Sequence, residues 1–340
     1  MANRVVESDY EYKRVTPLVW VRKEQEAVLT QVDSLILDID GVIMDVSNSF
    51  RIAISQTVQN YFCYVLGFKG DDILLSPSET QAFKLAGGFN NDWDLTSAAV
   101  LFYLIKAEQL TTDQTSVIRE QGQSIEDFTM AVRRTGGGIE GAREVMLTTL
   151  TREQRKKVEP KWNRATIEKT FQEMYGGVDY CERLYGFKPA YNRRQGLLND
   201  ERVMIDPEVI KPFLPKVGIL TGRTKNEMDI ALERSGLKDM IDPGLIISDG
   251  GSTPDKRKPH PENLIKLARK IKGQVTVYVG DVLDDLIIVN NANVNREAPS
   301  VFMSSLVVSP LRRAEVEFYM LEGADMISLD VNDALKSLVT

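Results

Sequence analysis

Short, almost uninterrupted apolar runs occur near the start of the chain and in its last third. They comprise residues 34–37, 217–220, 245–247 and 275–279. Runs of this kind are typical of strands that are buried on both faces of a parallel sheet. Helical spacing separates them, as in the amphipathic segment at 264–271 that follows Pro261. This alternation predicts an α/β fold with a doubly wound, mostly parallel sheet.

The pattern changes between Asp45 and about Asp206, where strand-like runs disappear and helical spacing dominates. Ser76-Pro77-Ser78-Glu79 has the form of a capping box, which predicts a helix that ends near Gly87. Asp94 is expected to cap the helix that follows. The predicted domains are an N-terminal extension or edge element (1–30), a sheet domain (31–46 and 206–340) and an inserted helical domain (47–205).

Three of the apolar runs end in polar residues that suit one reaction. These residues are Asp38, Asp40 and Gly41 after the first run, Thr221, Gly222 and Arg223 after the second, and Asp281, Asp284 and Asp285 after the last. Because ligands bind at the carboxyl ends of strands in open α/β sheets, at least three carboxylates should converge there. Their mutual repulsion is relieved by a divalent cation that prefers oxygen ligands, and Mg²⁺ is the expected ion.

The same residue types can carry out phosphoryl transfer. An ionised Asp can attack phosphorus, while a second acid protonates the leaving alkoxide and then deprotonates water. Asp38 and Asp40 are two residues apart on an extended segment, so their side chains face the same side. The Thr221 hydroxyl and the Gly222 N–H can hold phosphoryl oxygens, and a lysine can offset the negative charge.

Four segments together resemble the motifs of the haloacid dehalogenase (HAD) superfamily. They are Asp38-Ile39-Asp40-Gly41-Val42, Leu220-Thr221-Gly222-Arg223, Lys258-Pro259 and Gly280-Asp281 with Asp285. Within the superfamily they are similar to the phosphoglycolate-phosphatase-like branch, in which a helical cap follows the first motif. The resemblance implies a HAD-like (Rossmannoid) core with an all-helical cap, and a Mg²⁺-dependent phosphatase. Such an enzyme hydrolyses a small-molecule phosphate monoester through an aspartyl-phosphate.

The resemblance also implies a role for each matching residue. Asp38 is the nucleophile and a Mg²⁺ ligand, and Asp40 is the general acid and base that offers its backbone carbonyl to the metal. Thr221 binds the phosphoryl group, Lys258 balances charge, and Asp281 is the second metal-binding carboxylate. Because dehalogenases lack the second acid, Asp40 favours phosphoryl transfer.

Several assignments within these motifs keep alternatives. Asp285 fits the last, supporting acid of the fourth motif, with Asp284 as its rival. Lys256 or Arg257 could replace Lys258, although the Lys-Pro pair favours Lys258. Gly41, Gly222 and Arg223 are expected to contact the substrate.

Two segments of the inserted domain allow both a structural and a functional interpretation. Residues 87–94 are either a plain turn-rich loop or a specificity loop in which Asn90, Asn91 and Trp93 meet the substrate. In the glycine-rich segment 135–143, Gly136 and Gly141 have the spacing of a phosphate-binding loop. The Lys and Ser/Thr that should follow are missing, so we expect a flexible hinge or a disordered loop.

Composition excludes several other classes of protein. The 340 residues include 42 Lys and Arg against 49 Asp and Glu, a net charge of −7, which argues against binding nucleic acid. One histidine and two cysteines make a Ser-His-Asp triad, a zinc site or a disulfide scaffold improbable. No apolar run is long enough to span a membrane and no signal peptide is evident, so we expect a soluble, cytoplasmic protein.

Two other functions agree with the same residues. A sugar phosphomutase uses the same Asp nucleophile but returns the phosphoryl group to a sugar. A non-catalytic phosphate-binding module could retain the site without turnover. The expected partner is a small phosphorylated metabolite, and the sequence leaves its identity and the oligomeric state open.

Overall fold

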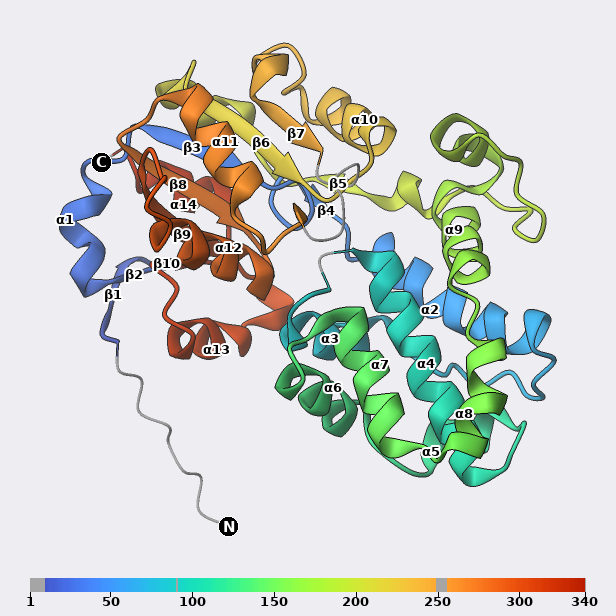
Figure 1. The fold of residues 1–340 in the computed structure, drawn as a ribbon. Helices are drawn as coiled ribbons and strands as arrows, with labels where there is room; N and C mark the ends of the chain where they lie inside the picture. Colours follow the sequence, from blue (N-terminus) through green and yellow to red (C-terminus); the bar gives the residue numbers. More distant parts are fainter. Residues whose placement is uncertain (1–9, 90, 249–255, 340) are drawn as a thin grey trace. The chain divides into compact units, whose positions relative to one another are not determined.

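The computed structural model describes residues 10–89, 91–248 and 256–339 (Figure 1). Its contacts divide the chain into two compact units. The sheet unit contains Met1–Asp45 and Arg202–Thr340, and the helical unit contains Val46–Glu201. Asn90, which we predicted to bind substrate, lies outside the described residues.

An eight-stranded sheet forms the centre of the sheet unit within the described residues, in the order β1-β2-β10-β9-β8-β3-β6-β7. Its strands are β1 (Tyr12–Thr16), β2 (Val19–Arg22), β3 (Ser34–Leu37), β6 (Val217–Thr221), β7 (Ile246–Ser248), β8 (Val275–Gly280), β9 (Val301–Val307) and β10 (Met326–Ser328). Neighbours from β10 to β7 run parallel, whereas β1 and β2 run antiparallel at one edge. This confirms the predicted α/β fold with a mostly parallel sheet. Two short strands, β4 (Met44–Asp45) and β5 (Arg202–Val203), pair separately.

The parallel strands are covered by helices that follow them in the chain. The helices of this unit are α1 (Glu26–Leu29), α10 (Lys225–Ser235), α11 (Glu262–Ile271), α12 (Leu283–Asn293), α13 (Glu315–Leu321) and α14 (Val331–Lys336). One apolar cluster joins Ile36 of β3 and Leu220 of β6 to α11 and α12. Burial of these side chains fixes the sheet from which the site residues project.

The N-terminal hairpin β1–β2 is fastened to the far edge of the sheet. β2 pairs with β10, and the Arg22 guanidinium contacts the Asp325 carboxylate at 2.6 Å. The other oxygen of Asp325 accepts hydrogen bonds from the Ser304 backbone N–H and hydroxyl at 2.8 and 3.0 Å. Part of the segment 1–30 is therefore an edge element of the sheet.

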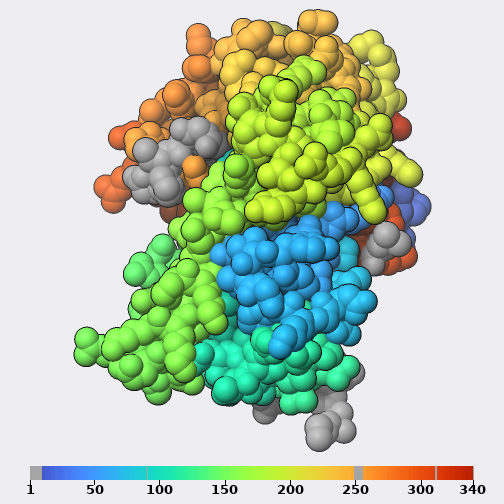
Figure 2. Space-filling model, turned by 90° about the vertical axis from the view of Figure 1, so that its right-hand side faces the viewer, coloured from blue at the N-terminus to red at the C-terminus, as the bar shows by residue number. Residues whose placement is uncertain are grey.

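The helical unit contains eight α-helices within the described residues. They are α2 (Phe50–Asn60), α3 (Thr80–Ala86), α4 (Asp92–Leu110), α5 (Thr115–Glu120), α6 (Ile125–Arg134), α7 (Gly138–Thr149), α8 (Arg152–Val158) and α9 (Arg164–Tyr185). Figure 2 shows the face on which the blue segment around α2 adjoins the green later helices, and Phe50 of α2 stacks on Tyr175 of α9 at 4.4 Å. The predicted capping box at Ser76–Glu79 is confirmed. No helix among the described residues combines the length and apolarity that crossing a membrane requires.

The glycine-rich segment 135–143 differs from our expectation. We predicted a flexible hinge or a disordered loop, but helix α7 already begins at Gly138. The Gly138 N–H donates to the Gly87 carbonyl at 2.9 Å, and a Cβ on Gly137 would lie 2.6 Å from that same oxygen. These glycines therefore let two backbone segments approach closely, which larger residues would prevent.

Candidate active site

The central strands of the sheet bring three predicted motifs to neighbouring positions. β3 lies between β8 and β6, and its carboxyl end is followed by Asp38. Asp281 follows β8, and Thr221 is the last residue of β6. All three residues are buried. Oxygen atoms of Asp38, Asp281 and Asp285 lie within 4.8 Å of one another, so three carboxylates share one small volume.

Lys258 lies between two of these carboxylates. Its Nζ is 2.9 Å from Asp38 Oδ2 and 3.1 Å from Asp285 Oδ1, and its side chain is fully buried. Burial alone lowers the pKa of Lys258, but the charges of Asp285 and Asp38 outweigh it and raise that pKa above its ordinary value. The amine is therefore a fixed positive charge inside the cluster.

Asp285 uses both of its carboxylate oxygens to hold neighbouring groups. Oδ1 accepts a hydrogen bond from the Tyr278 hydroxyl at 2.9 Å, in addition to its contact with Lys258. Oδ2 accepts the backbone N–H groups of Asp281 at 3.0 Å and Val282 at 3.2 Å. This arrangement favours Asp285 over Asp284 as the acid that orients the site.

The Asp38 carboxylate is directed by its surroundings. Oδ1 accepts the Ile39 backbone N–H at 2.7 Å, while Oδ2 faces Lys258. Burial raises the pKa of Asp38 to about 7, with Lys258 acting against the rise and the charges of Asp285 and Asp40 adding to it. A positive charge that entered the site would therefore favour the ionised, nucleophilic form.

Gly41 lies against the Asp281 carboxyl group. Its φ of +71° suits glycine, and a Cβ at this position would lie 2.3 Å from the Asp281 carboxyl group. Because the donors are all carboxylate oxygens, the cluster fits a hard cation such as Mg²⁺. Asp285 already contacts four donors, whereas Asp38 contacts only Lys258 and the Ile39 N–H among the printed contacts of the described residues. Asp38 and Asp281 are therefore the residues that would hold the cation.

Asp40 and Arg223 form a close ion pair in the sheet unit. Nε and Nη2 of Arg223 each lie 2.7 Å from Asp40 Oδ1. The Arg223 backbone N–H donates to Thr221 Oγ1 at 3.2 Å across Gly222, and its carbonyl accepts the Ser248 hydroxyl at 2.5 Å. The guanidinium is thus occupied by Asp40, and direct contact of Arg223 or Gly222 with a substrate stays a prediction.

Two residues beyond the motifs also contact Asp281. Arg312 Nη2 lies 3.6 Å from Asp281 Oδ2, and the Tyr319 hydroxyl donates to the Asp281 carbonyl oxygen at 3.1 Å. Both residues come from the segment that follows β9. Sequence reasoning missed them because neither belongs to a motif or to a strand end that the apolar pattern revealed.

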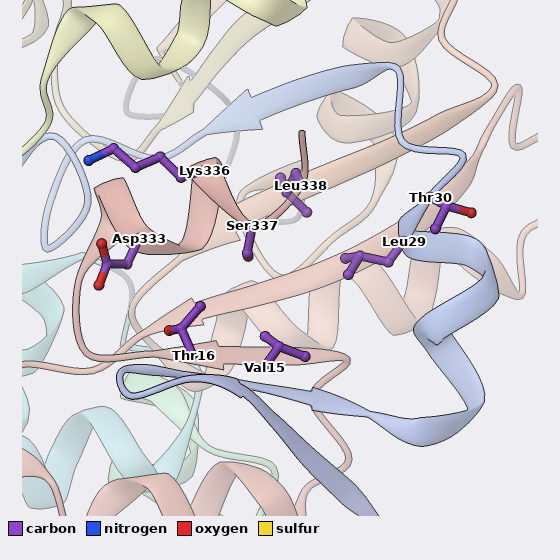
Figure 3. Close-up of a pocket in the computed structure, with 8 residues that line it drawn as sticks. All are labelled: Val15, Thr16, Leu29, Thr30, Asp333, Lys336, Ser337 and Leu338. Atoms are coloured by element: carbon purple, nitrogen blue, oxygen red, sulfur yellow. The ribbon is translucent and has the colours of Figure 1, made fainter. Parts of the chain in front are cut away.

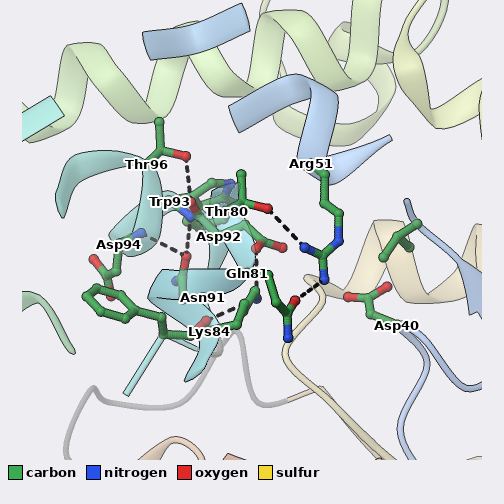
Figure 4. A network of polar contacts seen from close by, with 12 residues as sticks. Asp40, Arg51, Thr80, Gln81, Lys84, Asn91, Asp92, Trp93, Asp94 and Thr96 are labelled. Atoms are coloured by element: carbon green, nitrogen blue, oxygen red, sulfur yellow. Dashed lines mark hydrogen bonds and ion pairs between the residues drawn. The ribbon is translucent and has the colours of Figure 1, made fainter. Parts of the chain in front are cut away.

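In the helical unit, the predicted substrate-binding residues have structural contacts of their own (Figure 4). Asn91 Oδ1 accepts the backbone N–H groups of Trp93 at 2.8 Å and Asp94 at 3.4 Å. Asn91 therefore caps α4, and our expectation that Asp94 is the cap was wrong, because the cap and the helix start lie three residues earlier. Nearby, Lys84 Nζ lies 2.8 Å from Asp92 Oδ1, which fixes this turn. Substrate contact by Asn91 and Trp93 stays a prediction.

A cavity of about 380 Å³ lies elsewhere in the sheet unit (Figure 3). It is lined by Val15, Thr16, Leu29, Thr30, Asp333, Lys336, Ser337 and Leu338. None of these residues belongs to the four motifs. Three of their side chains are apolar, three carry a hydroxyl group, and the two charged ones have opposite sign. The carboxylate cluster is therefore the candidate active site, and this cavity is not part of it.

Comparison with known proteins gives similarities of three kinds. Residues 214–298, which contain three of the four motifs, match the model of a family described as haloacid dehalogenase-like hydrolase. Phosphatase Tt82 from Thermococcus thioreducens is 24% identical with a TM-score of 0.52, over 90% of this chain and 98% of that chain. A structural genomics target solved by X-ray crystallography is 16% identical with a TM-score of 0.54, over 91% and 98%. These two solved structures share the fold.

One curated relative is similar over a longer stretch of sequence. Imidazoleglycerol-phosphate dehydratase from Phytophthora nicotianae is 23% identical over 257 residues. The match includes 75% of this chain but only 40% of that relative. This chain thus spans less than half the length of the relative.

Proposed function

We propose that this chain, whose residues 214–298 match a haloacid dehalogenase-like hydrolase family, is a Mg²⁺-dependent phosphatase that hydrolyses a small phosphate monoester through an aspartyl-phosphate. The family match agrees with the resemblance seen in the four motifs. The single observation that carries the proposal is the buried cluster in which Lys258 contacts Asp38 and Asp285 while Asp281 lies within reach. A cation held by Asp38 and Asp281 would neutralise charge as a phosphoryl group approaches these carboxylates.

In the first half of the proposed reaction, Asp38 attacks the ester. A bond forms between a carboxylate oxygen of Asp38 and phosphorus, and the bond from phosphorus to the ester oxygen breaks. Asp40 gives its proton to the leaving alkoxide, so the alcohol departs neutral. The Thr221 hydroxyl holds a phosphoryl oxygen, and Lys258 keeps Asp38 in place through their 2.9 Å contact.

In the second half, water releases the phosphate. Asp40, now ionised, takes a proton from a water molecule, whose oxygen bonds to phosphorus as the bond to Asp38 breaks. This step restores the Asp38 carboxylate and the protonated Asp40. Arg223 holds the Asp40 carboxyl group in position through its two 2.7 Å contacts.

The curated relative adds one class of ester to those that should be tested. Its name refers to imidazoleglycerol phosphate, a phosphorylated polyol that carries an imidazole ring. We propose that phosphate esters of imidazole-bearing alcohols belong in the substrate panel, beside phosphoglycolate and sugar phosphates. The first step of the proposed reaction involves only the phosphoryl group, so selectivity must come from contacts to the rest of the ester.

A phosphate-release screen tests the proposed function. The purified protein is incubated with a panel of metabolite phosphate esters in Mg²⁺ and, in parallel, in EDTA. We expect release of inorganic phosphate from at least one ester in Mg²⁺ and none in EDTA. An isomeric sugar phosphate without free phosphate would instead identify a phosphomutase. A flat result across the panel would indicate a binding module.

The pH dependence of Mg²⁺ binding follows from the buried nucleophile. Because burial raises the pKa of Asp38 to about 7, the carboxyl group is largely protonated at pH 6 and must lose its proton when Mg²⁺ binds. Mg²⁺ affinity should therefore rise with pH and level off above pH 7. Calorimetry in buffers of different ionisation enthalpy should show release of about one proton per Mg²⁺ at pH 6 and close to none at pH 8. In Asp38→Asn the release at pH 6 should vanish, and its persistence would assign the proton to another group.

A further inference from the structure

A second positive charge faces the carboxylate cluster from outside the four motifs. Arg312 ends the short helix η10 (Pro310–Arg312) after β9, and its Nη2 lies 3.6 Å from Asp281 Oδ2. The side chains of Arg312 and Asp281 are 19% and 10% exposed, so water screens their attraction only partly. Lys258 contacts Asp38 and Asp285, whereas Arg312 faces Asp281, the acid expected to bind the metal.

The contact between Arg312 and Asp281 is electrostatic rather than directional. A separation of 3.6 Å exceeds the length of a hydrogen bond, so the guanidinium does not fix the orientation of the carboxylate. Other contacts position Asp281: the Tyr319 hydroxyl donates to its backbone carbonyl, and Gly41 leaves the space that its carboxyl group fills. Arg312 therefore contributes charge more than geometry.

Glu315 holds Arg312 at this distance. Nη1 of Arg312 lies 2.9 Å from Glu315 Oε2, three residues further along the chain in the first turn of α13. The guanidinium is thus shared between two carboxylates, with its shorter contact to Glu315. A small movement of the Arg312 side chain would bring the guanidinium closer to Asp281 or closer to Glu315.

We propose that Arg312 is a built-in counter-ion that competes with the dication for Asp281 and thereby lowers the affinity of the site for Mg²⁺. The proposal rests on the metal site of the proposed function, but it concerns how that site is tuned. Without a bound cation, Arg312 offsets the charge of Asp281 in a cluster of three buried acids. A cation bound there meets the repulsion of the guanidinium, which Glu315 limits by drawing Arg312 away.

The first test measures Mg²⁺ binding directly, by calorimetry on the whole purified chain at pH 8 with no ester present. In Arg312→Gln, loss of the repulsion should tighten Mg²⁺ binding about five- to tenfold. Arg313→Gln is the matched control, because it removes the same charge from the exposed neighbouring residue and should change affinity less than twofold. Arg312→Lys keeps the charge and should bind Mg²⁺ as the unaltered protein does.

Glu315→Gln is expected to change Mg²⁺ affinity in the opposite direction from Arg312→Gln. Without the carboxylate of Glu315, Arg312 turns fully to Asp281, so Mg²⁺ affinity should fall about threefold or more. If Glu315 acts through Arg312, the double variant should bind Mg²⁺ as Arg312→Gln does. If Glu315 attracts the cation directly, the two effects should add.

The outcomes separate this inference from the proposed function. Weaker or unchanged Mg²⁺ binding in Arg312→Gln would overturn it, since a residue that only orients Asp281 would weaken binding when removed. Additive effects in the double variant would overturn the role of Glu315. If the unaltered protein binds no Mg²⁺, the metal site itself fails and this inference fails with it. Thermal unfolding without Mg²⁺ identifies any variant that is misfolded. If Arg312→Gln is misfolded, Glu315→Gln carries the comparison, and unchanged Mg²⁺ binding in that variant would overturn the inference.

Discussion

Asp38→Asn is expected to lower the rate of phosphate-ester hydrolysis at least about a thousandfold while the protein stays folded. An amide oxygen does not form the phosphorus–oxygen bond on which both halves of the proposed reaction depend. The amide keeps the shape of the carboxyl group and can still accept the Ile39 N–H, now 2.7 Å from Oδ1. Lys258 keeps its contact with Asp285, so the free energy of unfolding should change by no more than about 1–2 kcal/mol.

Two measurements check the role of Asp38. Rapid acid quenching with an ester labelled in its phosphoryl group should trap label on the unaltered protein and none on Asp38→Asn. Asp239→Asn removes the same charge from an exposed position of the sheet unit and should keep full activity. Retention of more than a tenth of the activity by a folded Asp38→Asn protein would show that another group attacks the ester.

The central strands could be located from the sequence because each one is an apolar run that ends abruptly at polar residues. Burial explains the apolar run, and the chemistry of the site explains the polar end. A strand covered on both faces must be apolar throughout, so the run at 34–37 stands out and its end at Asp38 is unmistakable. β8 and β6, the neighbours of β3 in the sheet, show the same change from apolar to polar residues. The fold class and the strand ends were therefore predictable from the sequence alone.

Strands β1 and β9 were harder to predict from the pattern of apolar and polar residues. β1 is mostly exposed and reads Tyr-Lys-Arg-Val-Thr, which has the mixed polarity of an irregular segment. β9 is mostly buried but contains Ser304 and Ser305. Ser304 is accommodated by hydrogen bonds to Asp325: its N–H and hydroxyl donate to the carboxylate, and its hydroxyl accepts the Asp325 N–H. Ser304 and Asp325 are 21 residues apart, so no local sequence pattern shows that they pair. For this reason β9 was not predicted from the sequence.

Close approaches between distant segments were also invisible in the sequence. The glycines near 137 read as flexible because nothing in the chain says that the carbonyl of Gly87 will lie against them. Arg312 reads as one of several surface charges until folding brings it beside Asp281. Both cases depend on tertiary contacts, which override local propensity.

Lys258→Met is expected to destabilise the metal-free protein more than any other single change in the site. The side chain is fully buried, and its loss leaves the buried carboxylates of Asp38 and Asp285 without the cation that each contacts at about 3 Å. Removing one partner of a buried ion pair costs about 3–5 kcal/mol, which corresponds to a fall of roughly 10 °C in the Tm of a unit of this size. Activity should fall as well, because Lys258 balances the charge of the nucleophile.

The destabilisation of Lys258→Met should depend on pH with a definite sign. Burial already raises the pKa of Asp38 to about 7, and loss of the Lys258 charge should raise that pKa further. An acid whose pKa is higher in the folded state favours folding below its unfolded pKa of about 4 and loses that contribution as the pH rises through the folded value. The gap in stability between Lys258→Met and the unaltered protein should therefore widen from pH 5 to pH 8.

Mg²⁺ should restore part of the stability that Lys258→Met loses. A dication bound beside Asp38 replaces the missing positive charge, so saturating Mg²⁺ should raise the Tm of this variant more than that of the unaltered protein. Lys256→Met is the matched control, because Lys256 forms an exposed ion pair with Glu262 at 3.0 Å, and its loss should cost less than about 1 kcal/mol. Thermal unfolding with Mg²⁺ and with EDTA measures all three proteins. Equal Mg²⁺ responses in Lys258→Met and Lys256→Met would mean that the cation does not enter the cluster that Lys258 neutralises, and the assignment of Asp38 as a metal ligand would then be wrong.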